Sequence, residues 1–528
     1  MWVHSIGNSI MLVRKTISIL KSPSKKAFKN ASKTMDKYGY TLRQYQEAGV
    51  KWMIAQELKA GYKGGILADD PGLGKTIQTA ALMAGLPKKT LIIVPTAVLT
   101  QWREIMGEIF GHDEIYFHYG NEKKTTSREI CALNFNICIT SHGCAVSRKK
   151  KTYKTILHIP DFWKRIIIDE GHVIRNKKTK MHQTVLNYSM VDGAKWILSG
   201  TPIQNRRTDI INLLAFIGIP ISNIKANLEL YIADYLLRRT KKVLMDGIFQ
   251  ELNFNTHIIP FKTSEEQNTY NKIETASLEE LADLKYSGTS GLNYEMMVIE
   301  VLIRLRQASC HPQIAIDSMN SKYEEIEIDD FDDNSTKIDA VIHDISVAEG
   351  LSLVFCHFIG EMNTIKDQLN IIGITSELYN GSMSRQSRDA TLNSFKRGTT
   401  STKVLIVQIM AGGVGLNLQE FSNVFIVSPD WNPTNEIQAI SRAHRYGQTK
   451  TVTVHKYILT YNKAFILPDG DIDMDSTTID ERILRLQIKK RELMVDLLKD
   501  DTLKFNEKFK WCGYLEKNHE SIVSDYCI

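Results

Sequence analysis

The residues with the clearest potential for chemistry lie between Gly64 and Thr79, in the stretch GGILADDPGLGKTIQT. An apolar run typical of a strand ends there in a glycine-rich turn, and a helix begins at Gly-Lys-Thr. Such a turn directs consecutive backbone N–H groups into one concave space, and the N-terminus of the following helix adds its unpaired donors and its positive dipole end. The stretch therefore predicts a loop that binds polyphosphate.

Two side chains of this loop have predicted roles. Lys75 would reach the β- and γ-phosphates as a point charge, and the Thr76 hydroxyl would help to hold Mg²⁺. The match to G-x-x-x-x-G-K-[ST] is imperfect, because Asp69 stands at the first glycine position and Pro71 removes one N–H from the turn. An ordinary strand-to-helix turn with a surface lysine is the alternative. The predicted nucleotide contacts are Asp69, Asp70, Pro71, Gly72, Leu73, Gly74, Lys75 and Thr76.

A pair of carboxylates, Asp169 and Glu170, ends the apolar run RIIIDE at residues 165–170. An apolar strand that ends in two acids delivers them to the rim of a parallel sheet, where the phosphate loop also opens. We expect Asp169 to hold Mg²⁺ and Glu170 to orient and deprotonate the attacking water. A helix N-cap or a plain surface charge is the alternative for such a pair.

The elements that must position these residues are apolar runs that alternate with helical segments. This alternation predicts an α/β fold with two parallel-sheet lobes, each covered by helices on both faces. Residues from Pro220 to about Ile345 interrupt the alternation and are expected to be mostly helical, including Leu236–Leu244 and Met296–Ala308. The expected strands are 90–96, 114–119, 136–141, 165–170 and 195–200, then 351–358, 374–381, 403–410, 423–430 and 452–459.

Two arginines in the second lobe, Arg442 and Arg445, are spaced three residues apart on an expected helix. They would share one face of that helix and could point together into a cleft between the lobes. Two guanidinium groups that face a polyphosphate suit a loose, highly charged transition state. Solvated surface arginines are the alternative.

The N-terminal region contains a basic run of lysines between Lys21 and Lys37. The run could steer the chain to nucleic acid or serve as a nuclear import signal, but a solvated, poorly ordered arm is the expectation that we adopt. In the helical segment that follows, Gln46 could reach an adenine edge, although a polar residue on a solvated face is the default.

The composition of the chain limits the classes of protein to which it can belong. The chain has 528 residues, 43% hydrophobic and 24% charged, with a formal charge of +6 that permits nucleic acid as a partner without requiring it. Seven scattered cysteines without a C-x-x-C pair indicate reduced thiols, and we expect neither a zinc site nor a disulfide framework. Cys310 and His311 are expected to be structural. Residues 5–20 are too short an apolar run to span a membrane, so we expect a protein inside the cell without a membrane partner.

The ordered motifs resemble those of the Swi/Snf-type ATPases of helicase superfamily two. The matching stretches of the first lobe are Tyr40–Gln46 for adenine, Leu67–Gln78 for motif one, Leu91–Trp102 for motif Ia, Ile167–His172 for motif two and Leu198–Asn205 for motif three. Those of the second lobe are Leu353–Phe358 for motif four, Gln408–Pro433 for motif five and Gln438–Gln448 for motif six. Two further stretches, Leu236–Lys241 and Leu305–Pro312, are similar to the family's helical insertions, and Thr478–Leu493 is similar to its closing brace helix. Among the shorter members, the chain resembles the global transactivator proteins of baculoviruses.

The resemblance implies two tandem RecA-like lobes with helical insertions between and after them. It also implies a DNA-dependent ATPase that uses ATP and Mg²⁺ and moves along duplex DNA in the nucleus, in the host nucleus if the chain is viral. Chromatin or transcription proteins are implied as further partners. The residues carried over are Gln46, His172, Gly415 and Gln438 for the nucleotide and Trp431 for the duplex.

The implied domains are a basic arm at 1–39, an ATP-binding lobe at 40–220, a helical insertion and linker at 221–345, a second lobe at 346–460, and an acidic insert, brace helix and tail at 461–528. The sequence departs from the family at Asp70 and Pro71, where Glu-Met is usual, and at Gly171, which replaces the alanine of D-E-A-H. A catalytically weak DNA-binding transcription cofactor and a strand-separating helicase are the rival functions. The first is disfavoured by the intact Lys75, Asp169, Glu170, Arg442 and Arg445. The second is disfavoured by the S-P-D-W-N-P stretch at Ser428–Pro433 and by the R-x-x-R-x-G-Q pattern of motif six.

Overall fold

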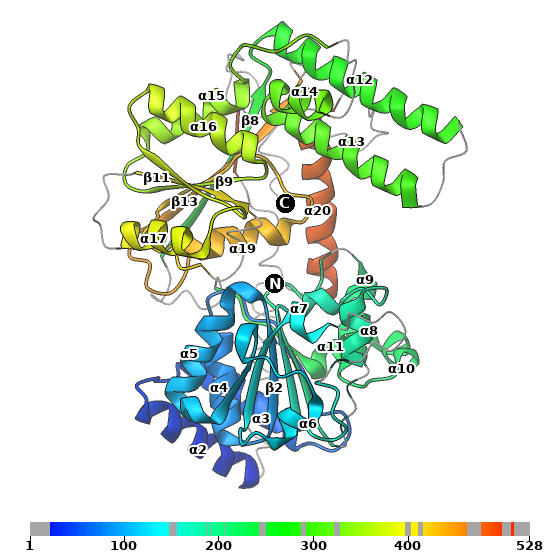
Figure 1. Ribbon diagram of the computed structural model, residues 1–528, viewed down its shortest axis with the longest axis vertical. Helices are drawn as coiled ribbons and strands as arrows, with labels where there is room; N and C mark the ends of the chain where they lie inside the picture. Colours follow the sequence, from blue (N-terminus) through cyan, green and yellow to red (C-terminus); the bar gives the residue numbers. More distant parts are fainter. Residues whose placement is uncertain are drawn as a thin grey trace, which may run out of the picture. The chain divides into compact units, whose positions relative to one another are not determined.

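In the computed structural model, the chain forms two compact units (Figure 1). Unit 1 comprises Met1–Asp246 and Glu492–Lys504, and unit 2 comprises Gly247–Arg491 and Phe505–Ile528. The structure describes residues 22–146, 155, 157–186, 188, 190, 192–204, 206–241, 250–286, 292–321, 328–396, 403–409, 416–461, 477–498 and 508–511.

Unit 1 is built on a parallel sheet in which the described residues form seven strands, in the order β3-β4-β2-β5-β6-β1-β7. The strands are β1 (Gly64–Leu67), β2 (Thr90–Val94), β3 (Ile115–His118), β4 (Ile137–Ser141), β5 (Arg165–Asp169), β6 (Ala194–Leu198) and β7 (Leu236–Leu237). The helices are α2 (Ser22–Lys37), α3 (Gln44–Leu58), α4 (Lys75–Gly85), α5 (Leu99–Phe110), α6 (Ser127–Ala132), α7 (His142–Ala145), α8 (Lys180–Leu186), α9 (Arg207–Phe216), α10 (Ile221–Ala226) and α11 (Leu228–Tyr235).

Alternate residues of each strand supply the two cores of unit 1. On β5, Ile166 and Ile168 pack in one cluster with α9 and α11, whereas Ile167 packs in the other with α3, α4 and α5. This division follows from the two-residue period of a strand, which sends neighbouring side chains to opposite faces. Because both faces are covered, the strands are mostly apolar, as the sequence predicted.

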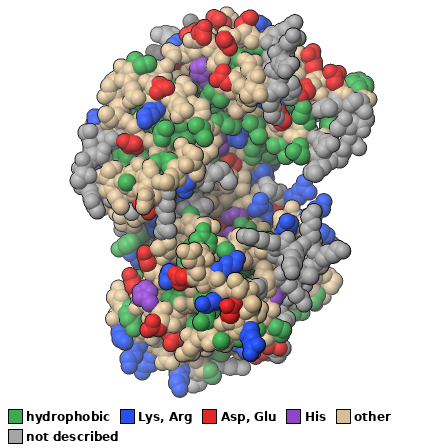
Figure 2. Space-filling model, in the orientation of Figure 1, with side chains coloured by type: hydrophobic (Ala, Val, Ile, Leu, Met, Phe, Trp, Pro, Cys, Tyr) green, Lys and Arg blue, Asp and Glu red, His purple; other side chains and the backbone are tan. Residues whose placement is uncertain are grey.

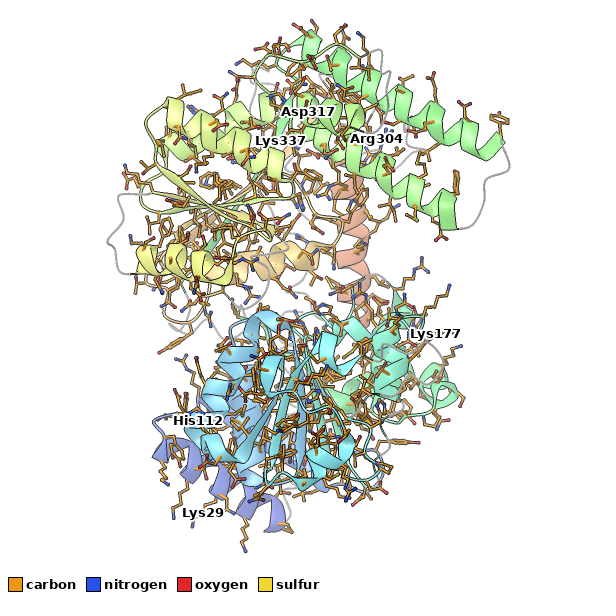
Figure 3. The ribbon with its side chains drawn as sticks, in the orientation of Figure 1. Lys29, His112, Lys177, Arg304, Asp317 and Lys337 are labelled. Atoms are coloured by element: carbon orange, nitrogen blue, oxygen red, sulfur yellow. The ribbon has the colours of Figure 1, made fainter. Side chains whose placement is uncertain are left out.

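The basic N-terminal segment forms helix α2, so the expectation of a poorly ordered arm is wrong for residues 22–37. Ala27, Ala31 and Met35 recur every four residues and are buried, which gives the helix an apolar face. That face packs closely on α4, where a Cβ added at Gly85 would lie 2.7 Å from the Ala27 carbonyl oxygen. The lysines occupy the opposite, exposed face, and Lys and Arg side chains gather there in Figure 2. Lys29 is labelled in Figure 3.

A buried ion pair joins α3 to the centre of this sheet. The Arg165 guanidinium on β5 donates through Nε and Nη2 to the two carboxylate oxygens of Glu57, at 2.6 and 2.7 Å. The Trp196 indole donates to the same carboxylate at 2.9 Å, and Lys88 lies 2.8 Å from it. Although burial raises the pKa of Glu57, the charges of Arg165 and Lys88 outweigh it and bring the pKa to about 2.

We expect Glu57→Gln to lower the free energy of unfolding of unit 1 by about 3–5 kcal/mol, because the change leaves the buried Arg165 charge without its counter-ion. Urea unfolding followed by circular dichroism measures the loss. The matched control is Glu47→Gln on the same helix, which removes a partly exposed pair with Lys51 and should cost less than about 1 kcal/mol. Equal costs for the two variants would contradict the stabilising role of the buried pair.

Unit 2 contains a second parallel sheet, in the order β10-β11-β9-β12-β13-β8-β14 among its described residues. Its strands are β8 (Leu252–Pro260), β9 (Ser352–Cys356), β10 (Ser376–Tyr379), β11 (Val404–Gln408), β12 (Asn423–Ile426), β13 (Val452–Thr460) and β14 (Lys508–Trp511). Its helices are α12 (Ser264–Tyr286), α13 (Leu292–Cys310), α14 (Pro312–Asn320), α15 (Thr336–Val347), α16 (Ile359–Ile371), α17 (Arg385–Lys396) and α19 (Pro433–Ala443).

The faces of the second sheet are covered by different helices. Residues of α19 pack in the cluster that contains Leu353 and Val424, and residues of α15 and α16 pack in the cluster that contains Val354 and Phe425. Helix α20 (Ile479–Leu498), which covers the expected brace helix, contributes to both units: Ile479 and Ile483 pack in unit 2, whereas Met494 and Leu497 pack in unit 1.

Two strands fall in the region that was expected to be helical. Leu236 and Leu237 form β7 in the first sheet, and residues 252–260 form β8 in the second. The expectation of a helix over residues 236–244 is therefore wrong for the part that the structure describes. Pairing of Leu236 and Leu237 with β1 overrides the local preference of these residues for a helix. The proposed domain boundaries stay a proposal. No described helix combines the length and apolar character that a bilayer span requires.

Candidate nucleotide site

The phosphate loop joins β1 to α4 in unit 1. Gly72 and Gly74 have φ values of 92° and 76°, in the left-handed region that glycine adopts without strain. Helix α4 begins at Lys75, so its first N–H groups, which have no partners within the helix, open into the loop. The backbone therefore has the conformation expected of an anion-binding loop.

Gln46 packs against this loop and is not on a solvated face. Its side-chain amide donates to the Leu73 carbonyl at 3.3 Å, and its oxygen accepts from the Arg43 N–H at 3.0 Å. A Cβ at Gly74 would lie 2.4 Å from the Gln46 Nε2. A glycine at position 74 thus permits both the left-handed backbone and the close approach of Gln46.

Lys75 spans the loop with its own side chain. The Nζ donates to the Asp69 carbonyl at 2.8 Å and lies 3.5 Å from the Asp70 carbonyl. A phosphate would offer this ammonium group a stronger, charged acceptor. The donor set of glycine-rich backbone, Lys75 and Thr76 fits the triphosphate of ATP.

The two acids of the loop are held by arginines that lie about 170 residues later in the chain. Arg239 donates through Nε to the Asp69 carboxylate at 2.8 Å and pairs with it through Nη2, and Gln78 donates to it at 2.9 Å. Arg238 donates to Asp70 at 3.1 Å. The Asp69 carboxylate is fully buried, so this side chain positions the loop from behind, and its predicted nucleotide contact would come from its backbone.

Asp169 lies at the end of β5, and both of its carboxylate oxygens are held. The Trp102 indole N–H donates to Oδ2 at 2.9 Å, and the Glu170 N–H donates to Oδ1 at 3.0 Å. Burial and the neighbouring Glu170 charge raise the pKa of Asp169 to about 6, against the opposing charge of Lys75. The structure thus brings Lys75, Asp169 and Glu170 together, and a divalent cation would complete the charge balance.

The backbone of Asp169 is also fixed. Burial lowers the pKa of His142 to about 4, so its imidazole is neutral at physiological pH. The His142 Nε2 lies 2.8 Å from the Asp169 carbonyl oxygen, and since a carbonyl can only accept, Nε2 carries the proton. His142 is a positioning residue.

Glu170 has a left-handed backbone, with φ of 47°. A non-glycine residue in this region carries strain and is often found at a functional site. The Glu170 carboxylate lies 3.3 Å from the His172 Nδ1, which lies 3.5 Å from the Ser199 hydroxyl. His172, predicted as a nucleotide contact, therefore connects the end of β5 to the segment after β6.

The structure accounts for Gly171 in place of alanine. A Cβ at this position would lie 2.6 Å from the Cγ2 of Ile197, a buried residue of β6. The methyl group of an alanine would occupy space that Ile197 already fills. Glycine at this position avoids a close contact with the neighbouring strand.

In unit 2, the expectation that Arg442 and Arg445 share one helix face is wrong. Helix α19 ends at Ala443, so Arg442 lies on its last turn and Arg445 lies in the turn that follows. The Gln448 amide, which donates to the Ala443 and Phe421 carbonyls, stabilises this turn. Burial lowers the pKa of Arg445, and its Nη1 lies 3.5 Å from the Leu416 carbonyl.

Two other predicted residues of unit 2 are partly or fully enclosed. Gln438 is buried on α19. Trp431 is half-buried and packs against Val301, Leu305 and Ile479, and its carbonyl accepts from Lys490 at 2.6 Å. Gly415 lies outside the described residues.

Sequence reasoning did not assign Arg238, Arg239, Trp102 or His142 to this site. For the arginines, the signal was two adjacent guanidinium groups directly after an apolar pair, which indicates a strand end rather than a helix. For Trp102 and His142, the sequence carried no signal of their contact with Asp169, because those contacts depend on how α5 and α7 pack beside β5.

Comparison with known proteins identifies two domains in the chain. Residues 45–225 match the SNF2-related domain, and residues 335–447 match the helicase conserved C-terminal domain. The chain belongs to the SNF2-related proteins. The SNF2-related match falls in unit 1, and the helicase C-terminal match falls in unit 2.

Relatives of this SNF2-related chain come from viruses, bacteria and eukaryotes. It is 27% identical over 442 residues to the probable global transactivator of Orgyia pseudotsugata multicapsid polyhedrosis virus. This alignment covers 79% of the present chain and 86% of the viral protein. It is 30% identical to the putative ATP-dependent helicase/translocase YwqA of Bacillus subtilis (80% of this chain) and 27% identical to the chromatin remodeling factor mit1 of Schizosaccharomyces pombe (92% of this chain). It spans only 46% and 34% of those two proteins.

A solved structure of the Sulfolobus solfataricus SWI2/SNF2 ATPase core in complex with dsDNA also aligns with the chain. The alignment covers 88% of this chain and 94% of that chain at 23% identity, with a TM-score of 0.35.

Proposed function

We propose that the chain is a DNA-stimulated ATPase that translocates on duplex DNA. The SNF2-related and helicase domains imply an ATP-hydrolysing enzyme. The observation that carries the proposal is the juxtaposition of Lys75 with Asp169, whose carboxylate is held at both oxygens, and with Glu170 beside it. Translocation is supported by the names of relatives that are called a helicase/translocase and a chromatin remodeling factor.

In this mechanism each residue has one task. The loop N–H groups and Lys75 would hold the β- and γ-phosphates. Thr76 and Asp169 would hold Mg²⁺, which when bound would neutralise charge on the phosphates. Glu170 accepts a proton from the attacking water at a carboxylate oxygen. Trp102 and His142 keep Asp169 in place. Arg442 and Arg445 would stabilise the charge that develops on the transferred phosphoryl group.

The proposed partners are duplex DNA and chromatin or transcription proteins, and the proposed location is the nucleus. The relatives called a global transactivator and a chromatin remodeling factor support both. Phosphate contacts should make DNA binding fall steeply with salt concentration.

ATP hydrolysis measured without nucleic acid, with single strands, with duplex DNA and with RNA tests the proposal. We expect the largest stimulation with duplex DNA and none above background for Lys75→Ala, which removes charge from the phosphate loop without altering a core. Stimulation by RNA or single strands alone would indicate a strand-separating enzyme instead. Turnover of Lys75→Ala within a few-fold of wild type would contradict ATP hydrolysis at this loop.

The raised pKa of Asp169 predicts a pH effect that depends on Mg²⁺. A carboxyl group with a pKa of about 6 keeps its proton below that pH, and a protonated carboxyl cannot hold the ion. At limiting Mg²⁺, hydrolysis should therefore fall as the pH falls through about 6, and the midpoint should move to lower pH as Mg²⁺ is raised. Rate profiles at several Mg²⁺ concentrations measure this shift.

Trp102→Phe provides the matched variant for that measurement. It removes the hydrogen bond that lowers the pKa of Asp169, so the midpoint at limiting Mg²⁺ should move to higher pH than in the wild type. A midpoint that is independent of Mg²⁺ in both proteins would assign the titration to another group.

Trp431 is the proposed contact with duplex DNA in unit 2. We expect Trp431→Ala to lower DNA-stimulated hydrolysis several-fold more than basal hydrolysis, because a DNA contact acts only when DNA is present. The control is Ile479→Ala, which removes a side chain from the cluster against which Trp431 packs. That variant should lose stability and both activities in proportion. If the two variants behave alike, Trp431 serves the core only.

A further inference from the structure

A cluster of metal-ligating side chains lies on one face of the second sheet, apart from the nucleotide motifs. It consists of His257 on β8, His455 on β13 and Asp344 on α15, all of them in unit 2. The ligand atoms of the three residues lie within 4.8 Å of one another. The earlier expectation of no zinc site was based on cysteine spacing and did not consider these donors.

The strand register explains why the two histidines meet. β8 and β13 are neighbouring parallel strands in which His257 is paired with Tyr457 and His455 with Asn255. Residues two apart on a strand share a face, so both imidazoles project from the same side of the sheet. Helix α15 packs on that side and supplies Asp344. Helix α15 can be found in Figure 3 by the label of Lys337, which lies two turns before Asp344 on the same face of the helix.

Two of the three ligand separations are close to those around a tetrahedral ion, and the third is within 4.8 Å. Two ligands that each lie about 2.05 Å from a tetrahedral zinc ion are about 3.3 Å apart. The His257 Nε2 lies 3.1 Å from the His455 Nδ1 and 3.6 Å from an Asp344 carboxylate oxygen. A hydrogen bond between the two rings requires a proton on one nitrogen, and a metal ion can take the place of that proton.

Neighbouring side chains fix the orientation of all three donors. The Tyr457 hydroxyl donates to the Asp344 carboxylate at 2.7 Å. The His257 ring stacks on Tyr457, and the His455 ring stacks on Phe425 at a centroid distance of 4.9 Å. Hydrogen bonds to ligating carboxylates and fixed imidazole rings are the outer contacts that metal sites ordinarily have.

We propose that His257, His455 and Asp344 bind one divalent transition-metal ion, with Zn²⁺ as the best match. Two imidazoles and one carboxylate leave a fourth position for water, which has access because Asp344 and His455 are only partly buried. The ion ties two adjacent strands to the helix that covers them, so it stabilises unit 2. Mg²⁺ is excluded by its preference for oxygen ligands.

Metal titration of the full-length, chelator-treated protein tests the site. The buffer contains excess Mg²⁺ and no ATP, so that Asp169 does not contribute. We expect one Co²⁺ per chain with the visible absorption of a tetrahedral ion, displaced by Zn²⁺, and an increase in Tm with Zn²⁺. His455→Ala and Asp344→Asn should lose the absorption and the Tm increase. The matched control is His343→Ala, an exposed histidine next to Asp344, which should bind as the wild type does.

Tyr457→Phe tests the outer contact with Asp344 and should weaken Zn²⁺ binding by about 10–100-fold. Circular dichroism and Tm in the presence of chelator show whether each variant folds. Binding that survives both His455→Ala and Asp344→Asn, or that is lost in His343→Ala, would overturn the proposal. Wild-type protein that takes up no Co²⁺ or Zn²⁺ at this site would identify the cluster as a hydrogen-bonded network only.

Discussion

Arg445→Ala should lower kcat for DNA-stimulated ATP hydrolysis by about 10³–10⁵-fold while changing ATP affinity little. An arginine that contacts the γ-phosphate stabilises the transition state more than bound ATP, and such a residue contributes this factor in phosphoryl-transfer enzymes. Lys75, Asp169 and Glu170 belong to unit 1 and Arg445 to unit 2, so neither unit contains the full proposed catalytic set.

The measurement is kcat and the ATP dissociation constant, each with and without duplex DNA, for the wild type, Arg442→Ala and Arg445→Ala. Lys450→Ala is the matched control, because it removes an exposed positive charge from the segment that follows the turn containing Arg445. It should retain wild-type kcat. DNA binding should survive in all three variants.

Full turnover in both arginine variants would show that the residues of motif six have a structural role only. Because Arg442 lies on the last turn of α19 and Arg445 lies after it, the two changes need not have equal effects. A large loss in one variant alone would identify the arginine that acts on the phosphoryl group.

Glu170→Gln should reduce hydrolysis by about 10²–10⁴-fold and leave ATP bound. The amide cannot accept a proton from water, and general-base catalysis by a positioned carboxylate contributes an effect of this size. The change keeps the shape of the side chain, so the loop, Lys75 and Asp169 remain in place. Equilibrium binding of a fluorescent ATP analogue and single-turnover hydrolysis separate the two steps.

The control for this change is Glu104→Gln, which neutralises an exposed carboxylate on α5, the helix that also supplies Trp102. It should have no measurable effect on turnover. Loss of ATP binding in Glu170→Gln would indicate that the residue supports the strained backbone at φ of 47° and not the chemistry.

Hydrophobic pattern and local motif chemistry determined most of the architecture from the sequence alone. Continuous apolar runs such as TLIIV at Thr90–Val94, alternating with helical segments, are typical of strands buried on both faces of a parallel sheet, so the α/β class and most strand positions could be predicted. The loop around Lys75 and the acids at Asp169 and Glu170 were identifiable because their chemistry is local. A few consecutive residues hold the groups that bind phosphate or metal.

Only the tertiary structure decided which distant residues support these groups. Arg239 reaches Asp69 from the end of β7, and Trp102 reaches Asp169 from α5, because parallel strands bring segments of any sequence separation to the same sheet edge. The same reason applies to Gly171, whose missing methyl is explained by Ile197 on the next strand, and to His257 and His455, which meet through strand register. Contacts between neighbouring strands and helices leave no periodic signal in the sequence, so the sequence predicted the reactive groups and the packing determined their surroundings.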